Sequence, residues 1–408
     1  MNIQQKYPAI SYLEARAKRR IPKFAWDYLA GGAMQDKGVI RNRSVFRDLT
    51  LTPKYLVSAP SDSCIAQSLL GYQFDAPFGV APIGLNGLIW PKASEHLSLA
   101  ATTHNIPFVL SLYATTSLET ISQIGGSANT WFQHYPQNDH GINRDILQRA
   151  KGADYETLVM TVDVPTTRKV RDIRNGLSLP IRLGPRAFLD VLRCPRWAFA
   201  TLKSGVPNFE NWFPHMPERY TSGQMAKFLE ELPILPHRSS LEELSRFRDL
   251  WSGAMMVKGI LHEDEALKCK ELGIDAVIVS NHGGRQLDEA PSSLEVIQEI
   301  RMAVGPDYPL LLDGGIRSGG DVALAIALGA DFVLLGRAFM ISLAALGAKG
   351  ADHAMTILKE EFRVTMLQLG CPKVRRLPEF LSFENPNYSD HRLSGSCNVI
   401  DFEGTERS

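Results

Sequence analysis

The segment DAVIVSNHGGRQLD, residues 275–288, places reactive side chains at the end of an apolar run. Residues 276–279 predict a short buried strand, and a Ser-Asn-His sequence ending at His282 follows it directly, then two glycines and Arg285. A tight turn needs the glycines but neither an imidazole, which accepts a proton near neutral pH, nor a guanidinium, whose fork matches a carboxylate. The alternative is a polar turn whose histidine caps a neighbouring carbonyl.

Eight short apolar runs, separated mostly by helix-like segments, are the elements that must position these side chains. Most are too continuous for half-exposed strands and are typical of a parallel sheet covered on both faces. Ser292 and Ser318 precede helix-like segments with the spacing of a capping box. The pattern predicts an α/β fold, a (β/α)₈ TIM barrel; a doubly wound sheet is the alternative, but no GxGxxG follows an early strand. The runs span residues 77–84, 107–111, 130–135, 157–163, 255–259, 275–283, 309–315 and 331–337.

Polar residues or glycines stand at the C-terminal end of nearly every run, where a barrel of this kind builds its active site. One such Thr or Gln often only satisfies the backbone, but a polar group at so many ends is hard to explain as structure. The sequence therefore predicts that His282 and Arg285 belong to a site at this face. The other groups are Gly84, Ser111 with Tyr113, Gln133 with Tyr135, Thr161 with Asp163, Lys258, Ser280, Asp313 to Arg317, and Gly336 with Arg337.

The last two runs also predict a phosphate site. Glycine-rich turns follow both of them, and such loops bind phosphate through backbone N–H groups and a helix N-terminus. Arg317 and Arg337 can add charge-assisted hydrogen bonds to the anion. The alternative is that Gly314 and Gly315 merely permit tight turns.

Composition excludes several other classes. The 408 residues include 44 basic and 44 acidic ones, so no charge excess points to nucleic acid. Five scattered cysteines without a CxxC argue against a disulfide framework or a structural zinc site and favour a reducing compartment. The N-terminal residues lack an apolar signal core, and no apolar run approaches the ~18 residues of a spanning helix. We expect a cytoplasmic protein without a metal site.

The motifs SNHGGRQLD, VKG, WFQHY, MTVD and DGGIRSGGD with LLGR resemble the FMN-dependent α-hydroxy acid dehydrogenase/oxidase family. The resemblance runs from IPKFAWDYLAGGA, near residue 21, to about Gly370, and SNHGGRQLD is close to diagnostic. GLNGLIWPKAS and CPRWAF resemble its membrane-associated (S)-mandelate dehydrogenase and bacterial L-lactate dehydrogenase branch. The resemblance implies FMN as cofactor and oxidation of an L-2-hydroxy acid, of lactate or mandelate type, to the 2-oxo acid.

The resemblance also implies roles for individual residues. His282 is similar to the catalytic base, Asp163 to the carboxylate that orients it, and Arg285 to the clamp on the substrate carboxylate. Tyr28 and Tyr135 are similar to donors to substrate oxygens. The implied FMN contacts are Pro82, Ile83, Gly84, Ser111, Gln133, Thr161, Lys258 and Ser280 around the ring, and Asp313, Gly314, Gly315, Ile316, Arg317, Gly336 and Arg337 at the phosphate.

One loop departs from the family pattern TVDxPxxGxRxRD, whose first arginine is a second ligand of the substrate carboxylate. Here it reads TVDVPTTRKVRD, one residue shorter and without the glycine. Counting back from Asp172 leads to Lys169, which cannot reproduce a bidentate fork, while the nearest arginine is Arg168. We predict Arg168 as the second ligand.

Residues 1–408 are predicted to form one domain, with a helical lead-in over about 1–70, a barrel over about 75–370 and a tail over about 371–408. Residues 177–251 form an insertion after strand four, far longer than the roughly 20 to 30 residues a barrel needs. Its first part predicts an interfacial membrane patch, with an active-site lid as the alternative. The patch residues are Arg182, Arg186, Phe188, Arg193, Arg196, Trp197, Phe199 and Lys203.

Gly84 bears on the electron acceptor, because oxidases of the family generally carry alanine there and quinone-linked members carry glycine. With the insertion, it favours a peripheral dehydrogenase on the inner membrane face that passes electrons to a quinone or another carrier. A soluble oxidase that makes hydrogen peroxide from O₂ is the alternative. The family resemblance also implies a homotetramer.

Two rival functions stay open from the residues alone. A phosphate-binding lyase or isomerase barrel would use Lys258 as a Schiff-base nucleophile. A catalytically dead flavoprotein would act only as a binding module, although His282, Arg285, Lys258 and Asp163 are all present.

Overall fold

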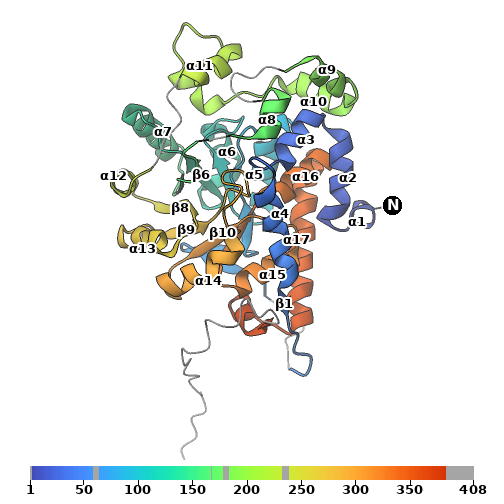
Figure 1. Ribbon diagram of the computed structural model, residues 1–408, viewed down its shortest axis with the longest axis vertical. Coiled ribbons are helices and arrows are strands. Elements are labelled where there is room, and N and C mark those ends of the chain that lie inside the picture. The colour runs from blue at the N-terminus through green and yellow to red at the C-terminus, as the bar shows by residue number, and fades with distance from the viewer. Residues whose placement is uncertain (1, 58–63, 167, 178–182, 232–238, 383–408) are drawn as a thin grey trace, which may run out of the picture.

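A closed barrel of eight parallel strands forms the centre of the computed structural model, which describes residues 2–57, 64–166, 168–177, 183–231 and 239–382 (Figure 1). Each of the eight predicted runs coincides with a strand of this barrel, although β8 extends one residue beyond its run at each end, so the predicted (β/α)₈ fold is confirmed. The strands are β4 (Phe78–Val80), β5 (Phe108–Ser111), β6 (Thr130–His134), β7 (Thr157–Thr161), β8 (Ala254–Ile260), β9 (Ala276–Val279), β10 (Leu310–Asp313) and β11 (Phe332–Leu335).

Helices connect the strands and cover the outside of the barrel (Figure 1). Both predicted capping boxes are present: Ser292 caps α14 and Ser318 caps α15. In each, the carboxylate of an acidic residue in the first turn accepts from the backbone N–H of the capping serine. These caps direct each chain from a strand end into its helix. The covering helices are α5 (Ala93–Thr103), α6 (Leu118–Asn129), α7 (His140–Gly152), α13 (Glu263–Glu271), α14 (Ser293–Val304), α15 (Gly319–Ala327), α16 (Arg337–Leu346) and α17 (Lys349–Leu369).

The N-terminal residues wrap the barrel. Helix α2 (Ile10–Arg20) packs on α16, and α3 (Lys23–Ala30) leads to the mouth where the strands end (Figure 1). Helices α1 (Ile3–Lys6) and α4 (Lys37–Ser44) flank them, and β1 (Thr50–Leu51) pairs antiparallel with β12 (Leu381–Ser382).

A short hairpin, β2 (Gln67–Leu69) and β3 (Tyr72–Phe74), packs against the aromatic interior of the barrel. Phe74 is buried and meets Trp131 of β6 and Phe332 of β11 edge-on, with ring centroids 6.2 and 5.7 Å apart. The aromatic cluster buries a large apolar area inside the barrel, which makes the interior a packed core.

The predicted long insertion lies between β7 and β8 and has two parts. Helices α8 (Val170–Asn175), α9 (Pro185–Leu192) and α10 (Pro195–Ser204) lie near α3, whereas α11 (Met225–Glu231) lies farther away at the same end of the molecule (Figure 1). The 3₁₀ turn η3 (Glu210–His215) comes between α10 and α11 in the chain. The last helix, α12 (Leu241–Leu250), lies against the barrel side instead, with Phe247 packed on the ring of His134. We therefore assign α12 to the helices around the barrel.

Candidate active site

The C-terminal ends of the barrel strands open into a cavity of about 570 Å³. Sixteen of the predicted site residues line it, and they come from the N-terminal lead-in as well as from the barrel. The lining set is Tyr28, Pro82, Ile83, Gly84, Tyr135, Thr161, Lys258, His282, Arg285, Asp313, Gly314, Gly315, Ile316, Arg317, Gly336 and Arg337.

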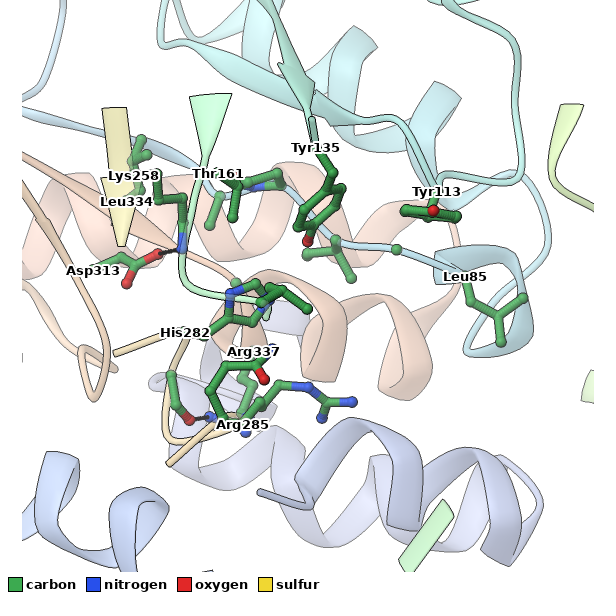
Figure 2. A pocket seen from close by; sticks show the side chains of 18 of the residues that line it. Leu85, Tyr113, Tyr135, Thr161, Lys258, His282, Arg285, Asp313, Leu334 and Arg337 are labelled. Atoms are coloured by element: carbon green, nitrogen blue, oxygen red, sulfur yellow. Dashed lines mark hydrogen bonds and ion pairs between the residues drawn. The ribbon is translucent and has the colours of Figure 1, made fainter. Parts of the chain in front are cut away.

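His282 and Asp163 form a pair although they are 119 residues apart in the chain. Nδ1 of His282 lies 2.9 Å from Oδ1 of Asp163. Because an ionised carboxylate can only accept, Nδ1 carries the proton and Nε2 is left to act as the acceptor. Figure 2 shows the imidazole in the cavity between Lys258 and Arg285.

Burial and neighbouring charges leave His282 neutral and Asp163 ionised. Burial lowers the pKa of His282 below its ordinary value, Asp163 opposes this shift, and Lys258 adds to it. Burial raises the pKa of Asp163, but the neighbouring His282 and Lys258 outweigh it and hold that pKa below its usual range. A neutral imidazole oriented by a carboxylate is the arrangement of a general base.

The two glycines after His282 have a packing reason. His282 itself has a left-handed φ of 57°, and Gly283 and Gly284 follow with φ of 66° and 75°. A Cβ on Gly284 would come 2.4 Å from the backbone nitrogen of Val39, so only glycine lets α4 approach this turn. The turn therefore aims the imidazole into the cavity and anchors the N-terminal lead-in.

Lys258 belongs to a buried network at the ends of neighbouring strands. Its ammonium donates to Ser280 Oγ at 2.7 Å and lies 3.0 Å from Asp313 Oδ2, while Ser280 Oγ donates to Asp313 Oδ1 at 2.5 Å. An ammonium held by a carboxylate is poorly suited to be the free amine nucleophile that a Schiff-base lyase needs. It does supply a positive charge at the cavity wall, and Figure 2 shows the Lys258 side chain joined to Asp313 there.

Several buried polar atoms near the cavity have no hydrogen-bond partner within the described part of the chain, among them Gln133 Nε2, Thr161 Oγ1 and Arg317 Nε. Buried polar groups are rarely left unsatisfied, so these atoms point to a bound polar group. Ser111 and Gln133 do not line the cavity; Ser111 Oγ donates to Gln133 Oε1 at 2.9 Å behind it. The unused donors fit the polar edge of a flavin ring and a phosphate.

The end of β10 and the segments that follow β10 and β11 carry the residues predicted for the phosphate, and all of them line the cavity. Burial lowers the pKa of Arg317 to about 10, Arg43 adds to the shift, and Arg317 lines the cavity, so a bound anion would relieve its desolvation. Gly315 has a packing role of its own, because a Cβ there would come 1.9 Å from the Asn42 carbonyl oxygen.

Arg285 is anchored to the C-terminal end of α3. Its Nη1 donates to the carbonyl oxygens of Tyr28 at 2.7 Å and Gly31 at 2.8 Å, and its guanidinium lies 4.8 Å from the Tyr28 ring centroid. Nε and Nη2 make no hydrogen bond within the described chain, although Nη2 lies 4.0 Å from Asp172 Oδ2, so this edge faces a substrate with Asp172 behind it. Burial raises the pKa of both Tyr28 and Tyr135, so their phenols stay protonated donors.

Arg337 also holds this segment. Its three guanidinium nitrogens donate to the carbonyl oxygens of Leu29, Gly283 and Gly31 at 2.7–3.0 Å. Arg337 thus ties the lead-in to the turn after His282, a role that sequence reasoning missed.

The structure does not bring Arg168 into the cavity. Arg168 is exposed, whereas Lys169, the next residue, is partly buried and lines the cavity with Arg285. The geometry therefore favours Lys169 over the predicted Arg168. The reason is that α8 begins directly after Lys169, which sets the direction of each side chain in the shortened loop.

One wall of the cavity was predicted only at Tyr113, as a strand-end group. Leu85, Tyr113, Phe209 and Leu229 line it, away from the ion-paired groups, and Figure 2 shows Leu85 and Tyr113 on the far side of Tyr135. Trp212 is fully buried and stacks on Tyr113, with ring centroids 5.6 Å apart. The aromatic run NFENWFP was the signal that could have found this wall.

The fold and site together define a flavin-dependent barrel oxidoreductase, and comparison with known proteins specifies the family. The family model described as FMN-dependent dehydrogenase matches residues 17–382, so the chain belongs to this family. (S)-Mandelate dehydrogenase of Pseudomonas putida is 37% identical over 392 residues, which cover 93% of this chain and 95% of that protein. An L-lactate dehydrogenase of Xanthomonas campestris pv. campestris is 36% identical and covers 90% of this chain and 95% of its own length.

Comparison with solved structures gives the same family. A crystal structure of the monotopic membrane protein (S)-mandelate dehydrogenase superposes with a TM-score of 0.86 at 36% identity, covering 92% of this chain and 98% of that one. The protein is an FMN-dependent dehydrogenase that oxidises an L-2-hydroxy acid.

Proposed function

We propose that His282 is the general base of this oxidation, that Asp163 orients it, and that Arg285 holds the substrate carboxylate. The observation that carries the proposal is the 2.9 Å pair of His282 Nδ1 with Asp163, which leaves Nε2 as the base inside the cavity. Bound FMN would accept the two electrons of the oxidation. Tyr135, whose phenol stays protonated, then donates to a substrate oxygen. The Tyr28 hydroxyl donates to the Gly84 carbonyl at 2.9 Å in this structure, so it would have to turn from that carbonyl to donate to the substrate.

The proposed FMN contacts rest on the residues that line the cavity and on the buried polar atoms without partners. Lys258 would hold the ring from the cavity wall, Thr161 would offer its unsatisfied hydroxyl to the ring, and Arg317 would hold the phosphate. Gln133, directly behind the wall, would offer its unsatisfied Nε2 from there. The apolar wall of Leu85, Tyr113, Phe209 and Leu229 receives the substrate side chain.

Anaerobic bleaching of the flavin tests the base. The purified holoenzyme is mixed with a panel of L-2-hydroxy acids, and His282→Ala is compared with the parent at equal flavin content. We expect the variant to retain FMN but to reduce it at least 10²-fold more slowly, since a general base contributes about 10²- to 10⁴-fold. A variant that bleaches at the parent rate would remove His282 from the mechanism.

We further propose that a patch on α9 and α10 binds a membrane surface. It comprises Leu183, Phe188, Leu189, Leu192, Phe199, Leu202 and Val206, all exposed, with Leu202 83% and Phe199 70% exposed. Arg186, Arg196 and Lys203 are exposed on the same helices, and Arg193 is exposed between them. Exposed apolar side chains beside basic ones suit acyl chains and anionic headgroups.

Two residues of the predicted patch need comment. Trp197 is wrong for this role, because it is buried, donates from Nε1 to the Leu88 carbonyl at 3.1 Å and packs edge-on against Phe24. Arg182 lies outside the described residues.

Within the described chain no helix is long and apolar enough to cross a membrane. The alternative of a lid has support of its own, because Phe209 and Leu229 of the same insertion line the cavity.

Liposome sedimentation distinguishes the membrane patch from the active-site lid. The protein should sediment with anionic vesicles at low salt, and Phe188→Ser with Phe199→Ser should abolish this while flavin reduction stays intact. Met302→Ser, at an equally exposed apolar residue on α14, is the matched control. Equal sedimentation of all three proteins would contradict the membrane patch.

The membrane-bound relative in the comparison also supports a lipid-soluble quinone as the electron acceptor and attachment at the inner membrane face. Reduction of a quinone analogue should be much faster than reduction of O₂; hydrogen peroxide formed at the full turnover rate would favour an oxidase. We propose a homotetramer from the family, and analytical ultracentrifugation in detergent tests it.

A further inference from the structure

Lys169 is a second cation at the part of the cavity where Arg285 lies. It precedes α8 directly, and its carbonyl accepts from the Ile173 N–H at 3.0 Å, which anchors its backbone. Its side chain lines the cavity with Arg285, Tyr28 and His282. No hydrogen bond joins its ammonium to another side chain of the described chain, so the ammonium is free to meet a ligand.

Charged groups from every side act on this amine. Burial is the largest cause, and together with the cations Arg285 and Arg337 of α16 it lowers the pKa of Lys169 to about 7. The carboxylates of Asp172 on α8 and Asp163 after β7 oppose the shift. The amine is therefore close to half protonated at neutral pH when no ligand is bound.

Arg285 alone leaves part of a bound carboxylate without a partner. Both protons of its Nη1 serve the carbonyls of Tyr28 and Gly31, and its Nη2 lies 4.0 Å from Asp172 Oδ2. A carboxylate offers about four lone-pair positions, more than the Nε and Nη2 edge of one guanidinium can fill. A second cation on the opposite side would complete the shell.

We propose that Lys169 is the second ligand of the substrate carboxylate, and that each substrate anion binds together with one proton taken up by the Lys169 amine. The step forms an N–H bond from a solvent proton, and the positive amine then pairs with the bound anion. This inference rests on the proposed role of Arg285 at the same carboxylate.

The proton makes substrate binding depend on pH in a defined direction. Lys169 binds the anion only when protonated, so binding weakens as pH rises above about 7, by at most about tenfold per unit for one linked proton. Once the anion is bound, the amine stays protonated, so the maximal rate of flavin reduction does not share this dependence. An arginine at this position would remain charged and abolish it.

Calorimetry of the holoenzyme measures the proton directly. The 2-oxo acid that corresponds to the best substrate is titrated into the protein at pH 8 and pH 6, in buffers of different ionisation enthalpy. The parent should take up about 0.9 proton per anion at pH 8, where a group of pKa near 7 is mostly neutral, and about 0.1 at pH 6. Lys169→Arg should take up none at either pH and still bind, and Lys169→Met should bind at least tenfold more weakly.

Arg174→Met is the matched control, because Arg174 is an exposed cation on the same short helix. It should match the parent in proton uptake and in affinity. Flavin absorbance verifies that each variant is folded and loaded. Uptake of less than 0.2 proton by the parent at pH 8, no anion binding, or parent-like uptake in Lys169→Arg would each overturn the proposal.

The kinetics separate this inference from the proposed base chemistry. Lys169→Met should raise KM at pH 7 and flatten its rise with pH, while His282→Ala lowers the maximal reduction rate. If the parent fails to reduce its flavin with any 2-hydroxy acid, the proposed function fails, whereas the proton uptake on binding the 2-oxo acid still tests Lys169 by itself.

Discussion

Asp163→Asn isolates the electrostatic contribution of the carboxylate behind the base. The variant keeps the size of the side chain but removes the negative charge 2.9 Å from His282 Nδ1. When His282 accepts the substrate proton, it becomes a cation whose charge centre lies about 4 Å from that of the carboxylate. At an effective dielectric constant of about 20, that pair is worth about 4 kcal/mol, or roughly 10³-fold in rate.

The pH dependence of flavin reduction in the Asp163→Asn variant gives a second, independent test of the pair. Asp163 raises the pKa of His282 against burial and Lys258, so its removal lowers that pKa further. The base is active when neutral, and activity is lost as pH falls through the His282 pKa. The acid limb of the variant should therefore lie at lower pH than that of the parent, although the plateau is about 10³-fold lower.

Anaerobic stopped-flow reduction of the flavin at saturating substrate measures both effects. KM should change much less than the rate, because Asp163 acts mainly through His282 and does not line the cavity. A modest rise in KM near neutral pH is expected, since Asp163 also favours the protonated Lys169 amine. Flavin content and thermal midpoint serve as controls for folding. A loss smaller than tenfold, or an acid limb displaced to higher pH, would refute this account of the pair.

Three further changes probe the carboxylate clamp, the phosphate loop and the core. Arg285→Lys keeps the charge but loses the fork anchored on Tyr28 and Gly31, so steady-state kinetics should show KM raised and the reduction rate lowered together; an unchanged KM would contradict the clamp. Arg317→Met removes the buried guanidinium at the predicted phosphate, and dialysis should strip FMN from this variant at least tenfold faster than from the parent, unless the phosphate lies elsewhere. Phe74→Ala empties the aromatic contact with Trp131 and Phe332, and urea unfolding should show a loss of about 3 to 5 kcal/mol, with a loss under 1 kcal/mol excluding a packed interior.

The strands and their order could be predicted from the sequence because they depend on local, repeated features. A strand buried on both faces must be continuously apolar, and the eight runs satisfy this whatever their neighbours are. The capping boxes at Ser292 and Ser318 are equally local, since each needs only residues three apart. The prediction that polar strand ends such as Lys258 and His282 meet at one cavity follows from the barrel itself.

The tertiary structure decided what depends on side-chain direction in irregular segments. The loop before α8 has no periodicity, so the sequence could not say whether Arg168 or Lys169 faces the cavity. In the insertion, composition grouped Trp197 with the exposed aromatic residues. In the structure its ring packs edge-on against Phe24 and its Nε1 donates to the Leu88 carbonyl, so the side chain points inward. The guanidinium of Arg337 likewise donates to backbone carbonyls of segments that are distant in the chain. The physical reason is the same in each case: burial and hydrogen bonding at these positions come from residues far away in the chain, and only the assembled barrel brings those residues within reach.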